Sequence, residues 1–143
     1  MLKRLISKLP SYTITVGGKP YLTRYYLFLK DRKFGNIYFH HFHSSDQGDE
    51  LHSHPFLFGL SFVFSGGYSE ESKNKDGSVS RKLFKAPTFN FITNKNFHRV
   101  DLLDELSGAW SIFVAGPRTK DWYFWDRHTN ETKHWSENPE AIP

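Results

Sequence analysis

The 143-residue sequence contains no cysteine and only one methionine. Without cysteine the chain can build neither a disulfide framework nor a thiolate metal site, so imidazole nitrogen or oxygen would have to hold any metal. The absence of cysteine also fits a reducing compartment, and we expect a cytoplasmic protein. No stretch is long and apolar enough to span a bilayer, and no secretory signal is visible, so no membrane association is expected.

Charge is not concentrated in one tract. The net charge of +4 permits anionic partners, but the basic residues around one predicted hairpin are interrupted by acidic ones. This mixture favours a solvated hairpin over a phosphate-binding track, so nucleic acid is not the expected partner. The basic residues are Lys73, Lys75, Arg81, Lys82 and Lys85, and the acidic residues are Glu70, Glu71 and Asp76.

Aromatic residues are abundant, with 14 Phe, 7 Tyr and 4 Trp making up 17% of the chain. Aromatic residues favour strands, and turn signals such as Asp76-Gly77 separate short apolar segments. The pattern predicts one all-β sandwich or barrel, with a core over about residues 12–126. A short helix or arm is expected over residues 1–9 and a C-terminal tail over 127–143. The predicted strands cover residues 12–16, 21–30, 36–43, 56–68, 79–85, 89–92, 97–103, 109–115 and 122–125.

Three histidines are the main candidates for a functional site. His52 and His54 are two positions apart, and in an extended chain such side chains project from the same face. His98 opens a later strand-like segment and could complete the group from a neighbouring strand. Three imidazoles in this arrangement predict a small metal centre in the barrel. If the strand continues through Pro55 without a bulge, every second residue from His52 to Phe64 lies on one face. His52 and His54 then share a face with Phe56, Phe58, Phe62 and Phe64. This arrangement predicts that the histidines lie in an interior lined by aromatic side chains.

His40 lies on another predicted strand, together with His41 and His43. It could be a fourth metal ligand, or it could orient one of the other imidazoles. His41 and His43 point to the opposite face and are expected to be partly exposed.

Two further side chains are candidates for handling a substrate. Arg118 ends a strand of buried character and could clamp a carboxylate or phosphate, or pair with Asp121 or Asp126. Tyr68 follows a pair of glycines and could position a substrate. Glu70 could act as a general base if it turned inward, although an exposed hairpin position is the expected one.

Gly48, the triplet His52-Ser53-His54, Gly66 and His98 follow one another along the chain in an order that resembles the conserved motifs of the cupin superfamily. The resemblance covers roughly residues 36 to 126 and is similar to small single-domain cupins of bacteria and their phages. It implies a cupin-type double-stranded β-helix, which is a jelly-roll barrel. Cupins include dioxygenases, isomerases, epimerases and binding proteins, so the resemblance does not select a reaction. The positions that carry it are Gly48, His52, His54, Gly66 and His98.

The sequence departs from the cupin pattern in one important respect. The acidic ligand usual in that family would fall at Phe58 or Gly59, and neither can bind a metal. Two outcomes remain open. The site is a three-histidine centre, as the resemblance to thiol-dioxygenase-like cupins implies, or it is a degenerate site that binds metal weakly or not at all.

The first functional hypothesis is a metal-dependent oxidoreductase of the dioxygenase type, with a divalent transition metal such as Fe, Mn, Ni or Zn. Three neutral imidazoles leave the double charge of the metal intact, which favours a small anionic ligand. The alternatives are a non-catalytic binding module for a sugar, nucleotide or protein, and a metal-free sugar isomerase or epimerase. The isomerase would use His52 or His98 as base and Tyr68 as acid. Aromatic strands and cupin precedent also suggest a homodimer.

Overall fold

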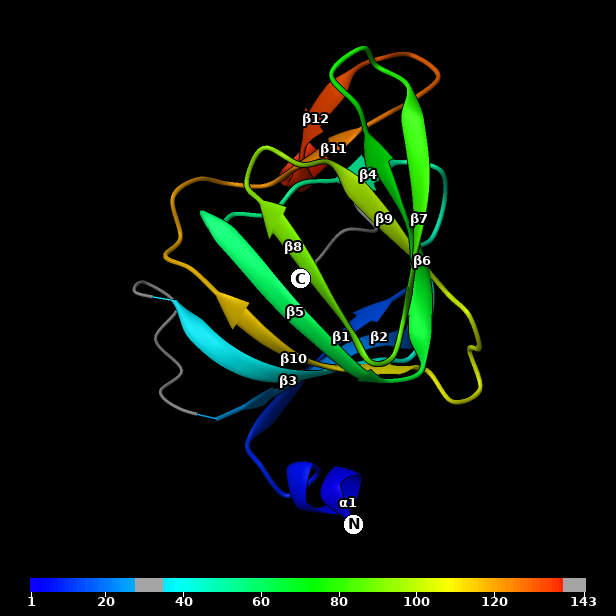
Figure 1. Ribbon diagram of the computed structural model, residues 1–143. Helices are drawn as coiled ribbons and strands as arrows, with labels where there is room; N and C mark the ends of the chain where they lie inside the picture. Colours follow the sequence, from blue (N-terminus) through cyan, green and yellow to red (C-terminus); the bar gives the residue numbers. More distant parts are fainter. Residues whose placement is uncertain (28–34, 138–143) are drawn as a thin grey trace.

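The computed structural model describes residues 1–27 and 35–137, which form two six-stranded antiparallel sheets and a short N-terminal helix (Figure 1). The first sheet runs in the order β1 (Ser11–Val16), β2 (Lys19–Tyr26), β3 (Asn36–Phe42), β10 (Ala109–Ala115), β5 (Phe58–Ser65) and β8 (Thr88–Thr93). The second runs in the order β12 (Thr132–His134), β11 (Tyr123–Trp125), β4 (Leu51–His52), β9 (His98–Leu102), β6 (Gly67–Lys73) and β7 (Val79–Lys85).

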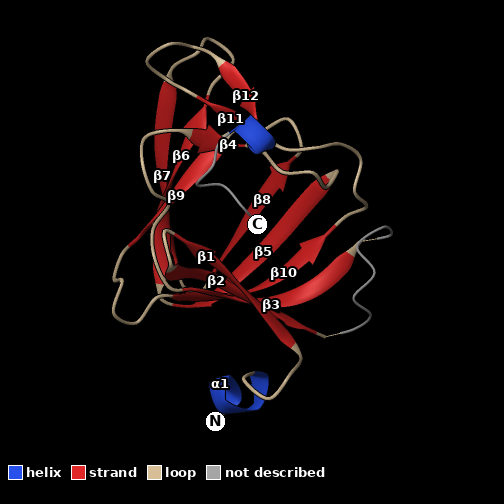
Figure 2. Cartoon of the chain, turned by 180° about the vertical axis from the view of Figure 1, so that it is seen from behind, coloured by secondary structure: helices blue, strands red, loops and turns tan. Residues whose placement is uncertain are grey.

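From β5 to β11 the chain moves back and forth between the sheets. Strands β5, β8 and β10 belong to the first sheet, whereas β6, β7, β9 and β11 belong to the second. This alternation is typical of a jelly roll and confirms the all-β, cupin-type fold predicted from the sequence. The helix α1 (Leu2–Ile6) projects beyond one end of the sheets (Figure 2), and the described helices include none able to cross a membrane.

The segment predicted as one strand over residues 56–68 is instead two strands in different sheets. The chain leaves β5 at Ser65 and enters β6 at Gly67, through Gly66 with a φ of +73°. A Cβ atom on Gly66 would lie 2.2 Å from the carbonyl oxygen of Gly108, so only glycine fits this crossing point. The predicted strand over residues 21–30 corresponds to β2, and its last three residues lie outside the described part of the chain.

The predicted aromatic interior of β5 is wrong beyond Phe56. Gly59, Ser61 and Val63 are the buried residues of this strand, and the alternate aromatic side chains face outward. The alternation breaks because Phe56 forms an isolated bridge with Arg118 before β5 begins at Phe58. In a regular strand, inward residues are two positions apart, but Phe56 and Gly59 both point inward and are three positions apart. The later phenylalanines of β5 therefore lie on the outer face.

The outer face of the first sheet is consequently apolar near its edge. On the edge strand β8, Phe89 is 64% exposed and Phe91 is 62% exposed, and Leu60 on β5 is also exposed. These side chains form no part of the interior. The homodimer suggested by the sequence stays a prediction.

The expected tail over residues 127–143 differs from the structure in its first part. Thr132–His134 forms β12, which pairs with β11, and Trp135–Glu137 forms a 3-10 turn. The turn stacks Trp135 on Trp122, with ring centroids 6.2 Å apart and nearly parallel planes. Both tryptophans line the cavity described below, so this segment helps to close the barrel. Residues 138–143 lie outside the described part of the chain.

Candidate metal centre

Two neighbouring strands of the second sheet, β4 and β9, and the residues that directly follow β4 bring the three histidines together. His52 at the end of β4 lies directly opposite His98 at the start of β9. Ser53, which is fully buried, is fixed to β11 by two hydrogen bonds: its N–H donates to the Tyr123 carbonyl at 2.8 Å, and its hydroxyl accepts from the Tyr123 N–H at 3.0 Å. With Ser53 fixed in this way, His52 and His54 project to the opposite side, as their spacing predicts.

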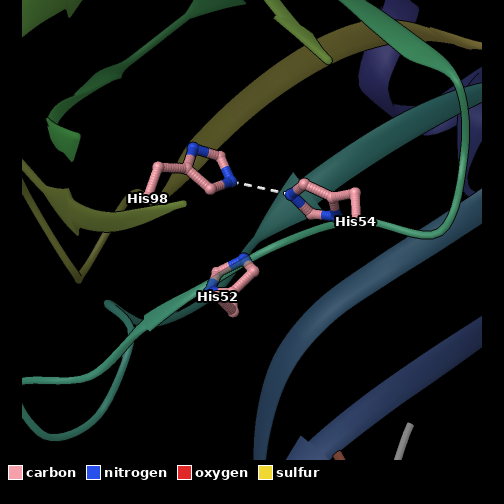
Figure 3. Close-up of side chains that lie close together, drawn as sticks. All are labelled: His52, His54 and His98. Carbon is pink, nitrogen blue, oxygen red and sulfur yellow. Dashed lines mark hydrogen bonds between the residues drawn. The ribbon is translucent and has the colours of Figure 1, made fainter. Parts of the chain in front are cut away.

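The three imidazoles form a nearly equilateral triangle (Figure 3). Their ring centroids lie 5.0 Å apart for His52 and His54, 4.8 Å for His52 and His98, and 4.9 Å for His54 and His98. One ring nitrogen from each residue lies within 4.8 Å of the others, and the Nε2 atoms of His54 and His98 are only 2.7 Å apart. The convergence of three nitrogen lone-pair donors suits one transition-metal ion.

Carboxylates lie behind two of the imidazoles. Glu70 Oε2 is 2.8 Å from His98 Nδ1, and Asp46 Oδ2 is 3.7 Å from His52 Nδ1. When His98 donates its Nδ1 proton to Glu70, the lone pair of a neutral ring is on Nε2, which points toward His54. An imidazole held by a carboxylate in this manner is oriented and made more basic for a metal.

Glu70 is itself firmly held. Its side chain is buried and accepts hydrogen bonds from Asn90 Nδ2 at 2.6 Å and from Ser72 Oγ at 3.2 Å. Burial raises the pKa of Glu70, but the hydrogen bonds from His98, Asn90 and Ser72 outweigh it, so the pKa is lowered overall. Glu70 is therefore an ionised buried carboxylate, and the expectation of an exposed hairpin residue is wrong.

His52 and His54 are neutral over the physiological range. Burial lowers the pKa of His52 to about 4, with the Asp46 carboxylate opposing and the His98 ring adding to the shift. Burial also lowers the pKa of His54 well below its usual value, and the rings of His98 and His52 contribute. Neutral imidazole is the form that binds a metal, so protons do not compete for His52 and His54 near neutral pH.

These lowered pKa values predict that the metal-free protein loses stability in acid. Between about pH 6.5 and pH 4 the unfolded chain protonates His52 and the folded chain does not, so unfolding takes up protons and becomes easier as the pH falls. His52 alone accounts for on the order of 3 kcal/mol across this window, at about 1.4 kcal/mol per pKa unit. Urea unfolding of chelator-treated protein at several pH values measures the slope. A free energy of unfolding that stays flat from pH 7 to pH 4.5 would contradict the prediction.

A cavity of about 620 Å³ adjoins the centre. Phe56 stacks on His54 and packs edge-on against Phe113, which gives the cavity an aromatic wall. Gly59 makes room for these rings, because a Cβ there would lie 2.5 Å from Phe113. The wall keeps the environment of the imidazoles largely apolar.

The structure places the predicted Tyr68 and Arg118 on this same cavity. The Tyr68 hydroxyl accepts a hydrogen bond from Asn90 Nδ2 at 3.2 Å, and burial raises the Tyr68 pKa to about 12, so the phenol stays protonated. Arg118 lies at the rim, 46% exposed, with its guanidinium 3.4 Å from Asp121. This ion pair is one of the two roles expected from the sequence, and the anion-clamping role stays a prediction.

His40 also lines the cavity but is not part of the three-histidine group. Its ring stacks on Phe113 at 4.7 Å and on Tyr38 at 5.6 Å. The side chain is 5% exposed, and its Nε2 atom is buried with no hydrogen-bond partner among residues 1–27 and 35–137. Leaving such an atom unsatisfied costs about 1–3 kcal/mol, which is a large cost for one residue of a small domain.

Sequence reasoning missed the roles of Asp46, Asn90 and Arg24. Asn90 was detectable in principle, because it lies between Phe89 and Phe91 and must point away from both. Arg24 is assigned to the cavity wall by the structure alone, since nothing in its sequence context separates it from a surface arginine.

The fold and the histidine triangle together define a jelly-roll protein with a candidate transition-metal centre. No family model matches the sequence, and no curated protein matches it. Among solved structures, Fe(II)-HppE with an alternative substrate is similar at a TM-score of 0.60 and 14% identity, covering 77% of this chain and 57% of that one.

Two further solved structures have similar lengths. KdgF from Halomonas is similar at a TM-score of 0.55 and 11% identity, covering 78% of this chain and 92% of its own. Streptomyces PAC13 with uridine is similar at a TM-score of 0.57 and 8% identity, covering 85% and 88%. The chain has the cupin fold, as the sequence resemblance predicts, and it spans little more than half of the HppE chain.

Proposed function

We propose that this protein is a metal-dependent cupin enzyme, of the oxidoreductase type, that acts on a small molecule in the cavity beside the histidine centre. The observation that carries the proposal is the convergence of the three imidazoles of His52, His54 and His98. A carboxylate fixes one of these rings and a second lies near another, which is the arrangement that metal ligands require. The cavity gives a substrate direct access to the same group.

The ligand chemistry limits the metal to a divalent transition ion such as Fe, Mn, Ni or Zn, and we propose Fe(II) first. All-nitrogen sites suit these ions, whereas calcium and magnesium prefer oxygen. The likeness of the fold to a protein described as Fe(II)-HppE supports iron as the first ion to test. When bound, the metal would supply Lewis acidity and, for iron, a site for oxygen chemistry.

The residues of the chain have separate tasks in this proposal. Glu70 keeps His98 in the tautomer that presents Nε2, and the aromatic rings of Phe56 and Phe113 exclude water. Tyr68 remains a hydrogen-bond donor because its phenol is protonated at physiological pH. The three ligands carry no charge, so a small anionic substrate would compensate the ion.

The test is metal content, measured by mass spectrometry on protein purified without a histidine tag. We expect nearly one transition-metal ion per chain, removed by chelation and restored by Fe(II), together with oxygen consumption in a screen of small acids. A well-folded protein that contains no metal and takes up neither Fe(II) nor Zn(II) would exclude the proposal.

One observation favours a second candidate, which is acid–base isomerisation without metal. Tyr68 and His98 both line the cavity and are linked through Asn90 and Glu70, so a proton donor and an imidazole base face one space. Solvent-deuterium exchange into sugar nucleotides by chelator-treated protein would support this candidate. Ligand binding with neither metal nor exchange would indicate a binding module.

A further inference from the structure

The inner face of the second sheet carries aromatic side chains directly beside the histidine centre. Phe124 on β11 lies directly opposite His52 on β4. Directly opposed residues of antiparallel strands point to the same face of a sheet, so Phe124 faces the same side as His52. Trp122 is two positions before Phe124 and shares that face, and both residues line the cavity.

The aromatic rings on the cavity side keep open surface, whereas the opposite face of the same strands is closed. On that opposite face, Leu51 and Ser53 are 0% exposed and Trp125 is 1% exposed. Trp122 and Phe124 are only partly buried. The opposite face therefore does the packing in this region, and the rings that face the cavity are available to a ligand.

The partly open rings form a continuous path that ends at the histidine centre. The rings of Trp135 and Trp122 are nearly parallel, with 6° between their planes and 6.2 Å between their centroids. The Trp122 centroid lies 5.2 Å from that of Phe124, which lies 6.4 Å from that of His52. A group that rests on Phe124 is therefore next to a candidate metal ligand.

The chemistry of this path favours a flat, unsaturated ring. Aromatic side chains attract another aromatic ring more strongly than buried area alone accounts for, in offset-stacked or edge-on arrangements. Phe56, which stacks on His54 and lines the same cavity, offers a further ring close to the centre. Phe56 and Phe124 have no hydrogen-bonding side-chain atoms, so the hydroxyls of a sugar would be costly to bury against them.

We propose that Trp122 and Phe124 form a ring-binding subsite, which selects ligands that contain an aromatic ring and holds this ring beside the three-histidine centre. The cavity of about 620 Å³ is within the range of small-molecule sites. This inference rests on the proposed function in taking the cavity as the ligand site, and it narrows the substrate class to aromatic compounds. The subsite itself needs no metal.

The test compares benzoate with cyclohexanecarboxylate, two probes of the same charge and ring size that differ in aromaticity. Binding is measured by calorimetry and NMR on the full chain, both chelator-treated and loaded with Zn(II). We expect the wild type to bind benzoate about threefold to tenfold more tightly than cyclohexanecarboxylate in both states. Burial of apolar area alone would give no such preference, because the saturated ring is at least as apolar.

Two variants assign the preference to the subsite. Phe124→Leu and Trp122→Leu keep an apolar side chain and remove the ring, so each should bring the ratio of the two affinities toward one. Trp122→Phe keeps a ring and should retain the preference. Phe89→Leu is the matched control, because Phe89 is 64% exposed on the outer face of the first sheet. Circular dichroism and thermal melting establish whether each variant is folded.

A measurement on the wild type alone covers the case in which a leucine variant does not fold. Nuclear Overhauser effects between the ring protons of bound benzoate and the rings of Trp122 and Phe124 would support the subsite. Effects confined to other aromatic residues would exclude it.

Other results would also overturn the inference. Equal affinity of the wild type for the two probes, or no binding of benzoate at millimolar concentration, would exclude the subsite. A preference that survives both leucine variants but disappears in Phe56→Leu would move the ring to the opposite wall. Metal content keeps these outcomes apart from the proposed function: a metal-loaded protein without the preference retains the centre and loses only the subsite. A metal-free protein with the preference retains the subsite and loses the enzyme proposal.

Discussion

Replacing His54 with alanine is expected to abolish stoichiometric metal binding and to leave the fold intact. Its Nε2 lies 2.7 Å from His98 Nε2, so the substitution removes one of three converging donors without unpairing Glu70 from His98. Loss of a direct ligand should exceed the roughly 10–100-fold effect typical of residues that only support a ligand. Metal titration by calorimetry and metal content by mass spectrometry measure the loss.

The matched control is His128→Ala. His128 is 68% exposed and lies 3.4 Å from Asp49, on the outside of the molecule. The His128→Ala substitution removes one imidazole and leaves His52, His54 and His98 in place. Equal metal content in the two variants, at the wild-type level, would show that the ion is bound elsewhere or nonspecifically. Equal loss in both would point to a global effect on folding.

The three histidines could be predicted from the sequence because the pattern that places them is local. A separation of two positions puts His52 and His54 on one face of any extended segment. The pairing of β4 with β9, which brings His98 opposite His52, is not local, and the cupin resemblance supplied it. The turn at Asp76-Gly77 was likewise predictable, because an Asp-Gly pair is a local hairpin signal. The structure confirms it: Gly77 has a φ of +85° in the turn between β6 and β7.

Strand β5 shows where local reasoning fails. Alternation identifies the two faces of a strand but does not decide which one is buried, and hydrophobicity favoured the phenylalanine face. The interior instead takes Gly59, Ser61 and Val63, because Phe56 and Phe113 from other segments already fill that space. The same limit applies to Arg24 and His40, whose shared position depends on the register of β2 with β3.

Glu70 was misplaced for a different reason. Its neighbours are polar, and the segment looks like an exposed hairpin, yet it lies two positions after the buried Tyr68 and must share its face. Glu71, on the opposite face, has the surface role expected of the hairpin and pairs with Arg81 and Arg127. The alternation of buried and exposed positions along the strand predicts a buried Glu70, whereas the polar composition of the segment wrongly predicts an exposed one.

This pair of adjacent glutamates allows a sharp test of how the centre is supported. In Glu70→Gln the amide oxygen can take the place of Oε2 and accept from His98 Nδ1 and Asn90 Nδ2, while the amide N–H₂ faces Ser72 Oγ. The hydrogen bonds are therefore retained and only the negative charge is lost. We expect metal affinity to fall about 10–100-fold, with little change in stability.

Glu70→Ala separates charge from geometry. It leaves His98 Nδ1 and Asn90 Nδ2 without their acceptor, at a cost of roughly 1–3 kcal/mol for each buried donor. Glu71→Gln is the control: it removes the same charge one position away, weakens the Arg81 and Arg127 pairs, and should leave metal affinity unchanged. Calorimetric titration with Zn(II) and urea unfolding separate the two quantities. Equal metal affinity in wild type and Glu70→Gln would show that the carboxylate acts only as a hydrogen-bond acceptor, because charge is the one property that this substitution removes.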